Sequence, residues 1–269
     1  MRAPPASRSD RSALAVAKDI AQQAGVRALA AFRQPHDVIV KGRGNLATET
    51  DLAVERFIKE AIAQEFPNHR IVAEETAADG DFEGWCWVID PIDGTKNFVS
   101  GIPFWCVNVA LCHDGEPVVA VTHDPNHGET FAAQRGGGAF VDGQPARASE
   151  RPDVQSSVVA FDLGYDDTQG HETLRMANAL FPSVQAFRVP GSAALGIAYA
   201  ACGRYDLFMH RYLFPWDIAA GILLVREAGG AITEHDGAPV SITSRTVLAG
   251  SPAAHADFLR WSKSRPNER

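Results

Sequence analysis

The sequence predicts an α/β fold made of two subdomains that share one interface. The first third carries two amphipathic helical periods, and residues 104–143 contain short β-branched and aromatic runs separated by glycine turns. Beyond residue 148, strands alternate with helices, which is typical of a layered α/β unit. Because no repeat or low-complexity linker separates these parts, we expect one subdomain over residues 1–148 and a second over residues 149–269.

The composition is typical of a globular enzyme. Of 269 residues, 45% are hydrophobic and 22% are charged, and the formal net charge is −8. An acidic protein lacks the basic surface that nucleic-acid binding usually needs, and no segment approaches the roughly 20 unbroken apolar residues of a membrane helix. The N-terminus has no apolar stretch of signal-peptide length. We therefore expect a cytoplasmic protein that binds neither nucleic acid nor a membrane.

Two helices are predicted in the first third, over Ser9–Phe32 and Thr50–Phe66, from apolar residues that recur at helical spacing. Ser9 or Asp10 is available to cap the first helix, and Thr48 and Asp51 form a short capping pair for the second. A strand is expected at residues 37–41 and a glycine-bearing loop at residues 42–45.

The middle of the chain is predicted to be mostly sheet. Asp114-Gly115 is a hairpin turn signal between two apolar runs, so we expect antiparallel pairing there. The expected strands of the first subdomain cover residues 70–75, 85–90, 104–112, 117–125, 129–135 and 139–143. In the second subdomain we expect strands at 156–161, 184–189, 206–210 and 231–235, and helices at 168–181, 192–202 and 216–228.

Cysteine and histidine spacings do not predict a zinc site. The four cysteines lie in apolar contexts and match no zinc or redox motif, which is typical of small buried hydrophobic residues: Cys86, Cys106, Cys112 and Cys202. His123 and His127 are four residues apart, but the intervening Asp-Pro-Asn is turn chemistry, so the two imidazoles are not expected to share a helix face.

The stretch VIDPIDGTKNF, Val88–Phe98, predicts a metal and phosphate site. It places Asp90 and Asp93 at the end of an apolar strand, where open α/β sheets bind their ligands. Two neighbouring carboxylates repel each other unless a cation lies between them, and Mg²⁺ prefers such oxygen ligands together with a phosphate. Gly94 allows close backbone approach, and the amides of Gly94 and Thr95 face a phosphate if a helix begins there. The alternative is a pair of surface Asp-Pro and Asp-Gly turns.

The run DPIDGTKN closely resembles the signature of the inositol monophosphatase superfamily, whose usual form has Thr in place of Lys96. A second signature of that family, a Trp-Asp pair followed by Glu-Ala-Gly-Gly, resembles PWDIAAGILLVREAGG at Pro215–Gly230. Pro215 suits a first helical turn, where an Asp such as Asp217, taken alone, is more often a helix cap than a metal ligand. Three further elements resemble the family in the right order: LATETD with Asp51, VAEET with Glu74, and VPGSAAL with Gly191.

The resemblance implies a layered α/β sandwich with alternating αβαβα layers, and Mg²⁺-dependent hydrolysis of a small phosphate monoester by a metal-activated water. It implies two to three Mg²⁺ ions held by Glu74, Asp90, the Ile92 carbonyl, Asp93 and Asp217. Asp51, Glu74 and Thr95 are implied to orient and deprotonate the attacking water. The implied substrate contacts are Asp93, Gly94, Thr95, Gly191, Ser192, Ala193 and His210. Lithium inhibition and a homodimer also follow from the resemblance.

Three positions depart from the family pattern and leave the substrate open. His210 stands where inositol phosphatases carry a Glu that binds substrate hydroxyls, and an imidazole offers one donor and one acceptor where a carboxylate only accepts. Asn45 stands near a frequent Asp, and Lys96 occurs in family variants that include histidinol-phosphate phosphatases. Inositol monophosphate is the expected substrate; histidinol phosphate, fructose 1,6-bisphosphate and nucleotide 3′-phosphates are alternatives. A regulatory binding protein that retains the phosphatase fold is an alternative of another class.

Overall fold

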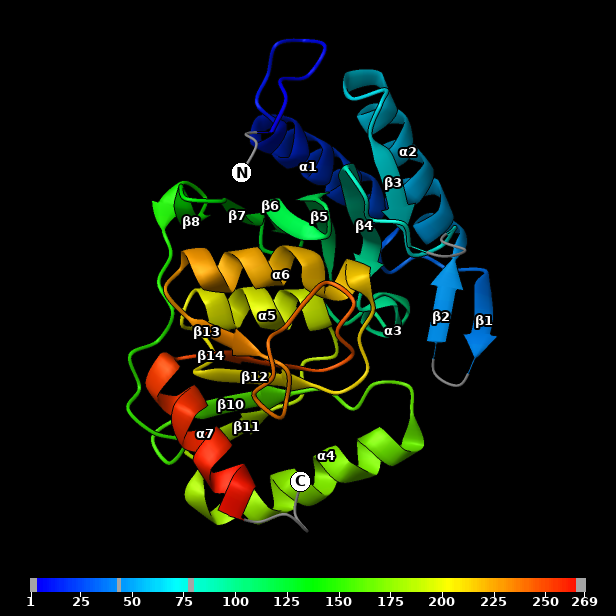
Figure 1. Ribbon diagram of the computed structural model, residues 1–269. Coiled ribbons are helices and arrows are strands. Elements are labelled where there is room, and N and C mark those ends of the chain that lie inside the picture. The colour runs from blue at the N-terminus through cyan, green and yellow to red at the C-terminus, as the bar shows by residue number, and fades with distance from the viewer. Residues whose placement is uncertain (1–3, 43–44, 77–79, 265–269) are drawn as a thin grey trace.

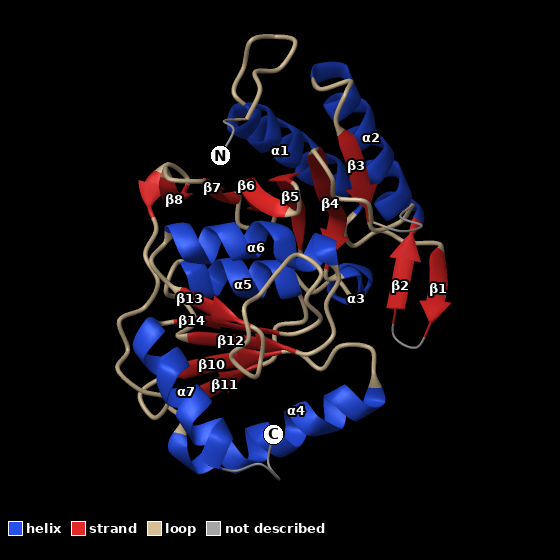
Figure 2. Cartoon of the chain, in the orientation of Figure 1, coloured by secondary structure: helices blue, strands red, loops and turns tan. Residues whose placement is uncertain are grey.

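Two sheets and three helix layers alternate in the computed structural model, which describes residues 4–42, 45–76 and 80–264 (Figures 1 and 2). A seven-stranded sheet lies between an outer layer of α1 (Ala13–Ala31) and α2 (Glu49–Glu65) and a central layer of α5 (Ala193–Ala201) and α6 (Pro215–Glu227). A five-stranded sheet lies on the other side of α5 and α6, and its outer face is covered by α4 (Asp167–Leu180) and α7 (Pro252–Ser264). The expected αβαβα layering is confirmed.

The seven-stranded sheet follows the chain order of its strands. They are β3 (Arg70–Ala73), β4 (Trp85–Asp93), β5 (Cys106–His113), β6 (Glu116–Asp124), β7 (Glu129–Gln134), β8 (Gly138–Val141) and β9 (Gln144–Pro145). Every neighbouring pair is antiparallel except β3 and β4, which are parallel. Asp114 and Gly115 adopt φ angles of 50° and 77°, as a tight hairpin turn requires, so the predicted β5–β6 hairpin is confirmed.

The five-stranded sheet is mixed. Its spatial order is β11 (Ala186–Arg188), β10 (Val158–Phe161), β12 (Leu207–His210), β14 (Val247–Gly250) and β13 (Ala231–Thr233). β10 is parallel to both of its neighbours, so the carboxyl ends of β10 and β12 meet at one edge of the sheet. The sequence analysis did not predict β14 or α7, which complete this half of the molecule.

The two predicted helix starts had different outcomes. The cap expected at Ser9 or Asp10 is wrong: α1 begins later, and the Ser12 side chain accepts a hydrogen bond from the Ala15 amide. Asp10 lies in a turn with φ 59°, where it cannot lead into a helix. The capping pair of α2 is confirmed, because the Thr48 amide donates to Asp51 Oδ2 at 2.8 Å and the Thr48 hydroxyl accepts from the Asp51 amide.

The central helix pair lies between the two sheets. α5 and α6 are rich in small residues, and almost all of their side chains are buried in one hydrophobic cluster with residues from both sheets. Gly196 and Gly221 allow this close packing. A Cβ atom at Gly196 would lie 2.3 Å from the Phe208 ring, and one at Gly221 would lie 2.5 Å from the Ile197 side chain. The two sheets therefore share one interface, and the boundary near residue 148 stays a prediction.

A small hairpin of β1 (Val38–Gly42) and β2 (Asn45–Thr48) lies apart from both sheets, beside the carboxyl end of β4 (Figure 1). The strand predicted at residues 37–41 is thereby confirmed, whereas residues 43 and 44 of the predicted loop lie outside the described residues. Among the described helices, none has both the length and the apolarity needed to cross a bilayer.

Candidate active site

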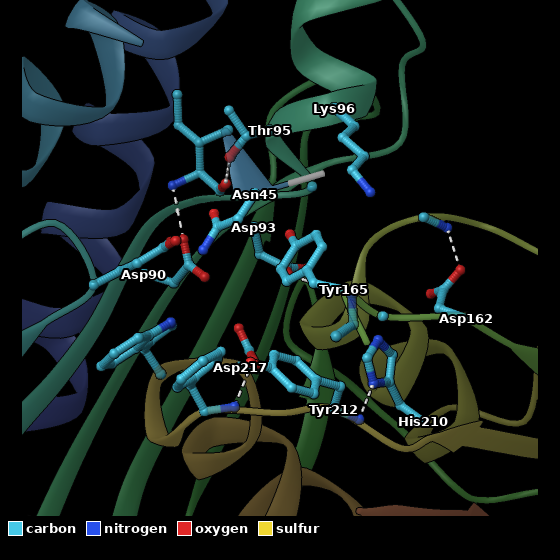
Figure 3. A pocket seen from close by; sticks show the side chains of 18 of the residues that line it. Asn45, Asp90, Asp93, Thr95, Lys96, Asp162, Tyr165, His210, Tyr212 and Asp217 are labelled. Carbon is cyan, nitrogen blue, oxygen red and sulfur yellow. Dashed lines mark hydrogen bonds between the residues drawn. The ribbon is translucent and has the colours of Figure 1, made fainter. Parts of the chain in front are cut away.

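A cavity of about 310 Å³ opens where the carboxyl end of β4 meets the first turns of α3 (Thr95–Val99), α5 and α6 (Figure 3). The carboxyl ends of β10 and β12 form its opposite wall, at the edge where α/β sheets gather their ligands. Its lining includes these predicted site residues: Glu74, Asp90, Ile92, Asp93, Gly94, Thr95, Gly191, Ala193, His210 and Asp217. Asp51 and Ser192 lie behind the lining and are buried.

Three carboxylates converge on one side of the cavity. Asp90 and Asp93 come from the end of β4, and Asp217 comes from the first turn of α6, 124 positions further along the chain than Asp93. One oxygen atom from each lies within 4.8 Å of the other two. The structure thus brings together the two acids of the first motif and the acid of the second.

A strand irregularity places Asp90 and Asp93 on the same face of the sheet. Residues three apart in a regular strand would point to opposite faces. Here Asp90 pairs with Asn108 and Asp93 pairs with Cys106, so three steps on β4 oppose two steps on β5. This β-bulge explains why the motif needs its Pro-Ile spacer.

The carboxylates are held from behind by helix starts and turns. Asp93 accepts hydrogen bonds from the Ser192 hydroxyl, from the Ala193 amide at 3.3 Å and from the Ala194 amide at 2.9 Å. Asp217 accepts from the Phe214 amide at 2.7 Å (Figure 3). The Ser192 hydroxyl and two amides of the predicted substrate turn therefore bind Asp93, and their contact with substrate stays a prediction.

The acid cluster is electrostatically unfavourable without a cation. Burial is the first cause that raises the pKa of Asp90, Asp93 and Asp217 above the ordinary range of a carboxyl. For Asp90 the next causes are the neighbouring charges of Glu74 and Asp93. An all-oxygen set of carboxylates, two buried and one half-buried, fits a hard divalent cation such as Mg²⁺, whose charge would stabilise the ionised forms.

Glu74 lies beside this cluster and is paired with a lysine. Its Oε1 atom accepts a hydrogen bond from Lys41 Nζ at 3.2 Å, and the same ammonium group donates to Glu75 at 2.6 Å. Burial raises the pKa of Glu74 to about 7. Glu74 is not part of the three-acid cluster found among the described residues, so its role as a metal ligand stays a prediction. The sequence analysis missed Lys41.

Thr95 and Asp51 form a polar pair next to the acids. The Thr95 hydroxyl oxygen lies 3.3 Å from Asp51 Oδ1 and 3.1 Å from the Ile92 carbonyl, so its single proton has two available acceptors. Burial raises the pKa of Asp51. Gly94 precedes this pair with φ 95°, and a Cβ there would lie 3.1 Å from the Gly191 carbonyl oxygen. Only glycine fits this turn, which starts α3 as the motif predicted.

The opposite wall carries groups of a different kind. Asp162 follows β10, and its Oδ1 atom accepts a hydrogen bond from the Gly191 amide at 2.7 Å. His210 ends β12, and its Nδ1 atom accepts from the Tyr212 amide at 3.1 Å. Burial raises the pKa of Asp162 to about 7 and lowers the pKa of His210 to about 4. The ammonium nitrogen of Lys96 lies 4.6 Å from the centre of the Tyr165 ring.

Asp162, Tyr165 and Tyr212 were not predicted from the sequence. One signal for Asp162 was present, because it directly follows the predicted strand at residues 156–161 and so stands at a strand's carboxyl end. The two tyrosines sit in loops with no motif. Their rings meet edge to face with centres 6.1 Å apart, a contact between residues 47 positions apart that only the fold brings about.

Histidine and cysteine residues outside the cavity have ordinary structural contacts. His123 Nδ1 lies 3.1 Å from the Glu129 carbonyl oxygen, and His127 Nδ1 lies 2.7 Å from Asp124 Oδ2. His123 is in β6 and His127 is in the following turn, so they do not share a helix, as predicted. Cys86, Cys106 and Cys112 are buried free thiols, and Cys202 is partly buried.

Comparisons with known proteins show which family the chain resembles. Residues 9–265 match the sequence pattern described as the inositol monophosphatase family. The chain is 39% identical over 253 residues to inositol monophosphatase 1 of Solanum lycopersicum, covering 91% of this chain and 93% of that protein. It is 38% identical to the Nus factor SuhB of Escherichia coli, covering 79% and 80% of the two chains. The solved structure of the IMPase of Thermotoga maritima superposes with a TM-score of 0.85 at 31% identity, covering 93% and 96%.

Proposed function

Because this chain belongs to the inositol monophosphatase family and is a phosphoric monoester hydrolase, we propose that it hydrolyses inositol monophosphate with bound Mg²⁺. The observation that carries the proposal is the convergence of Asp90, Asp93 and Asp217, of which the first two are buried and the third is half-buried, with one oxygen of each within 4.8 Å of the others. A protein that only bound a partner would have no chemical need for such a costly cluster.

The proposed metal ligands divide between two main ions. Glu74, Asp90 and the Ile92 carbonyl would hold one ion, and Asp90, Asp93 and Asp217 would hold the other, with Glu74 available to a third, weaker ion. When bound, Mg²⁺ supplies Lewis-acid charge stabilisation to a phosphoryl group. Asp51, Glu74 and Thr95 are proposed to orient an attacking water and accept its proton, which agrees with the Thr95–Asp51 contact of 3.3 Å.

The phosphate is proposed to lie against the first turn of α3. The amides of Gly94 and Thr95 begin that helix, directly after Asp93. Phosphoryl transfer depends mostly on positioning and charge stabilisation, so fixed amides and fixed carboxylates are what the reaction needs from the protein. Gly191, Ala193 and His210 line the side of the cavity proposed to hold the alcohol half of the substrate.

The test is release of inorganic phosphate from inositol 1-phosphate by the purified protein, with Mg²⁺ and with a chelator. We expect Mg²⁺-dependent release, and no release in the chelator. Hydrolysis of histidinol phosphate or fructose 1,6-bisphosphate in preference to inositol 1-phosphate would replace the proposed substrate and keep the phosphatase.

A regulatory role is a second candidate, because one relative is named a Nus factor. It would be favoured if the folded protein released no phosphate from any of these esters in Mg²⁺. A cytoplasmic homodimer is proposed from the family resemblance, and sedimentation of the purified chain measures the oligomeric state directly.

A further inference from the structure

A buried amide lies behind the acid cluster, in the middle of strand β5. Asn108 is only 1% exposed, and the residues on the same face of the strand, Cys106 and Ala110, belong to the hydrophobic cluster around α5 and α6. An asparagine in such a position is unfavourable unless its amide is hydrogen-bonded, because burial removes the amide from water. Asn108 is not among the described residues that line the cavity. The groups that its side chain binds therefore show what it does.

Both ends of the Asn108 side-chain amide are hydrogen-bonded. Nδ2 donates to the Trp216 carbonyl at 2.6 Å, and Oδ1 accepts from the Thr122 hydroxyl at 2.7 Å. A carbonyl oxygen only accepts, so the group that faces Trp216 has to be the NH₂ group. Thr122 is fully buried on β6 and pairs directly with Asn108 in the ladder. The Thr122 hydroxyl thus holds the amide in the orientation in which it binds Trp216.

The Trp216 carbonyl belongs to the peptide group that leads into Asp217. The N–H of the same peptide group donates to the Phe214 carbonyl at 3.1 Å. With Asn108 bound to the carbonyl, this peptide group is fixed at both of its ends. The Asp217 carboxylate also accepts from the Phe214 amide at 2.7 Å, so the side chain is fixed as well. Of these contacts, the one from Asn108 ties the first turn of α6 to the seven-stranded sheet.

The same asparagine stands beside Asp90. Asp90 of β4 and Asn108 of β5 are direct partners in the antiparallel ladder. Side chains of direct partners lie on the same face of a sheet, with Cβ atoms about 4.5–5.5 Å apart. Asn108 is therefore held beside Asp90 by the ladder, and it holds the backbone of Asp217 by its amide. It connects two carboxylates of the cluster that come from distant parts of the chain.

We propose that Asn108 is a positioning residue for the metal site, which sets the place of Asp217 relative to Asp90, and that Thr122 acts through Asn108. Mg²⁺ demands near-ideal ligand geometry, so a small displacement of one carboxylate weakens its binding. Groups that hold metal ligands in place are typically worth about 10- to 100-fold in metal affinity or activity. This inference rests on the proposed Mg²⁺-dependent function.

A purely structural role for Asn108 makes a different prediction. A buried amide that only joined α6 to the sheet would contribute to the stability of the fold and leave the affinity for Mg²⁺ unchanged. The two roles therefore separate in a measurement of Mg²⁺ binding without substrate. Thermal unfolding in a chelator is the second readout, since both roles predict a lower Tm when the amide is removed.

The experiment is a calorimetric titration of the purified full-length protein with Mg²⁺. Asn108→Leu keeps a side chain of similar size and removes both hydrogen bonds, and we expect it to raise the Kd for Mg²⁺ by at least about 10-fold. Thr122→Val keeps the shape of the threonine and removes only the hydroxyl, so the expected rise is about 3- to 10-fold. Thr122→Ser retains the hydroxyl and should keep a Kd close to that of the wild type.

A double variant tests whether Thr122 acts through Asn108. If it does, adding Thr122→Val to Asn108→Leu leaves the Kd for Mg²⁺ unchanged, because the hydroxyl has no amide left to orient. A further rise in the double variant would contradict this part of the inference. Thr130→Val is the matched control. Thr130 is a buried threonine of the neighbouring strand β7, outside the cavity lining, and its hydroxyl lies 3.0 Å from His123 Nδ1. The control is expected to keep the wild-type Kd for Mg²⁺.

The outcomes separate this inference from the proposed function. Wild-type protein that binds no Mg²⁺ and releases no phosphate contradicts the proposed function, and the inference with it. Mg²⁺-dependent hydrolysis by the wild type, together with an unchanged Kd in Asn108→Leu and Thr122→Val, overturns the inference and leaves the phosphatase intact. An equal loss of affinity in Thr130→Val also overturns it. If Asn108→Leu fails to fold, as judged by circular dichroism, the comparison of Thr122→Val with Thr122→Ser decides.

Discussion

The two walls of the cavity differ in how their charges are arranged. One wall brings together Asp90, Asp93 and Asp217, three like charges that need a cation. On the other, Asp162 and His210 follow one another's neighbours at the ends of β10 and β12, and Tyr165 and Tyr212 line the same part of the cavity. A cation and a phosphate are common to all phosphate monoesters, so the first wall suits the shared chemistry, and selectivity has to come from the second.

The largest effect is expected on the acid wall. Asp217→Asn and Asp93→Asn should each lower kcat/KM by at least about 100-fold for inositol 1-phosphate and alike for cyclohexyl phosphate, an ester of the same six-membered ring without hydroxyl groups, because a neutral amide is a poor ligand for a hard cation and even outer-shell partners of metals are worth about 10- to 100-fold. Circular dichroism should show an unchanged fold. Full activity of either variant would remove these residues from the proposed metal site.

A smaller loss is expected at Thr95, whose hydroxyl oxygen lies 3.3 Å from Oδ1 of Asp51, a residue proposed to orient the attacking water. Thr95→Val keeps the side-chain shape and removes the hydroxyl, so kcat should fall by about 100-fold with little change in KM, the size expected for a group that helps a proton transfer. Thr95→Ser keeps the hydroxyl and should retain most activity. If valine and serine behaved alike, the hydroxyl would have no part in the reaction.

The wall that carries Asp90, Asp93 and Asp217 was predicted from the sequence far better than the opposite wall, which carries Asp162 and His210. Asp90, Asp93, Gly94 and Thr95 form one contiguous motif, and its spacing reflects a local bulge in β4. Asp162, Tyr165 and Tyr212 are single residues whose meaning depends on which strands are neighbours, and strand order is a long-range property. The layering was predicted from the family resemblance, whereas β14, α7 and the capping residue of α1 were not predicted.

Lithium inhibition can distinguish the contributions of the two walls to hydrolysis without a mutation. If lithium acts at the acid wall, as the family resemblance implies, it should inhibit hydrolysis of inositol 1-phosphate and cyclohexyl phosphate to the same fractional extent at matched saturation in Mg²⁺. A titration of phosphate release measures this. Inhibition confined to the polyol ester would place the lithium effect on the alcohol wall instead.

The smallest effect is a dependence of thermal stability on pH. Burial raises the pKa of Glu74 and of Asp162 to about 7, and raises those of Asp90 and Asp217 as well. Between the unfolded pKa near 4 and the folded pKa near 7, the native state binds more protons than the unfolded chain, so stability is lost as the pH rises. The Tm of the protein, measured in the presence of a chelator, should therefore be lower at about pH 7 than at about pH 5.

Mg²⁺ should oppose this loss of thermal stability only at pH values at which the acidic side chains are ionised. We expect added Mg²⁺ to raise the Tm at about pH 7 and to have little effect at about pH 5, with a gain of about 2–4 °C for each kcal/mol of binding. Scanning calorimetry on the same samples measures both shifts. An equal Mg²⁺ effect at the two pH values would point to binding at surface carboxylates rather than at the buried cluster.

The most direct test of the account is phosphate release from inositol 1-phosphate by the wild-type protein, measured in a chelator and again after Mg²⁺ is restored. The account predicts hydrolysis only with Mg²⁺, since the converging carboxylates of Asp90, Asp93 and Asp217 fit a divalent cation. Hydrolysis at the full rate in the chelator, or a folded protein that releases no phosphate with Mg²⁺, would contradict it.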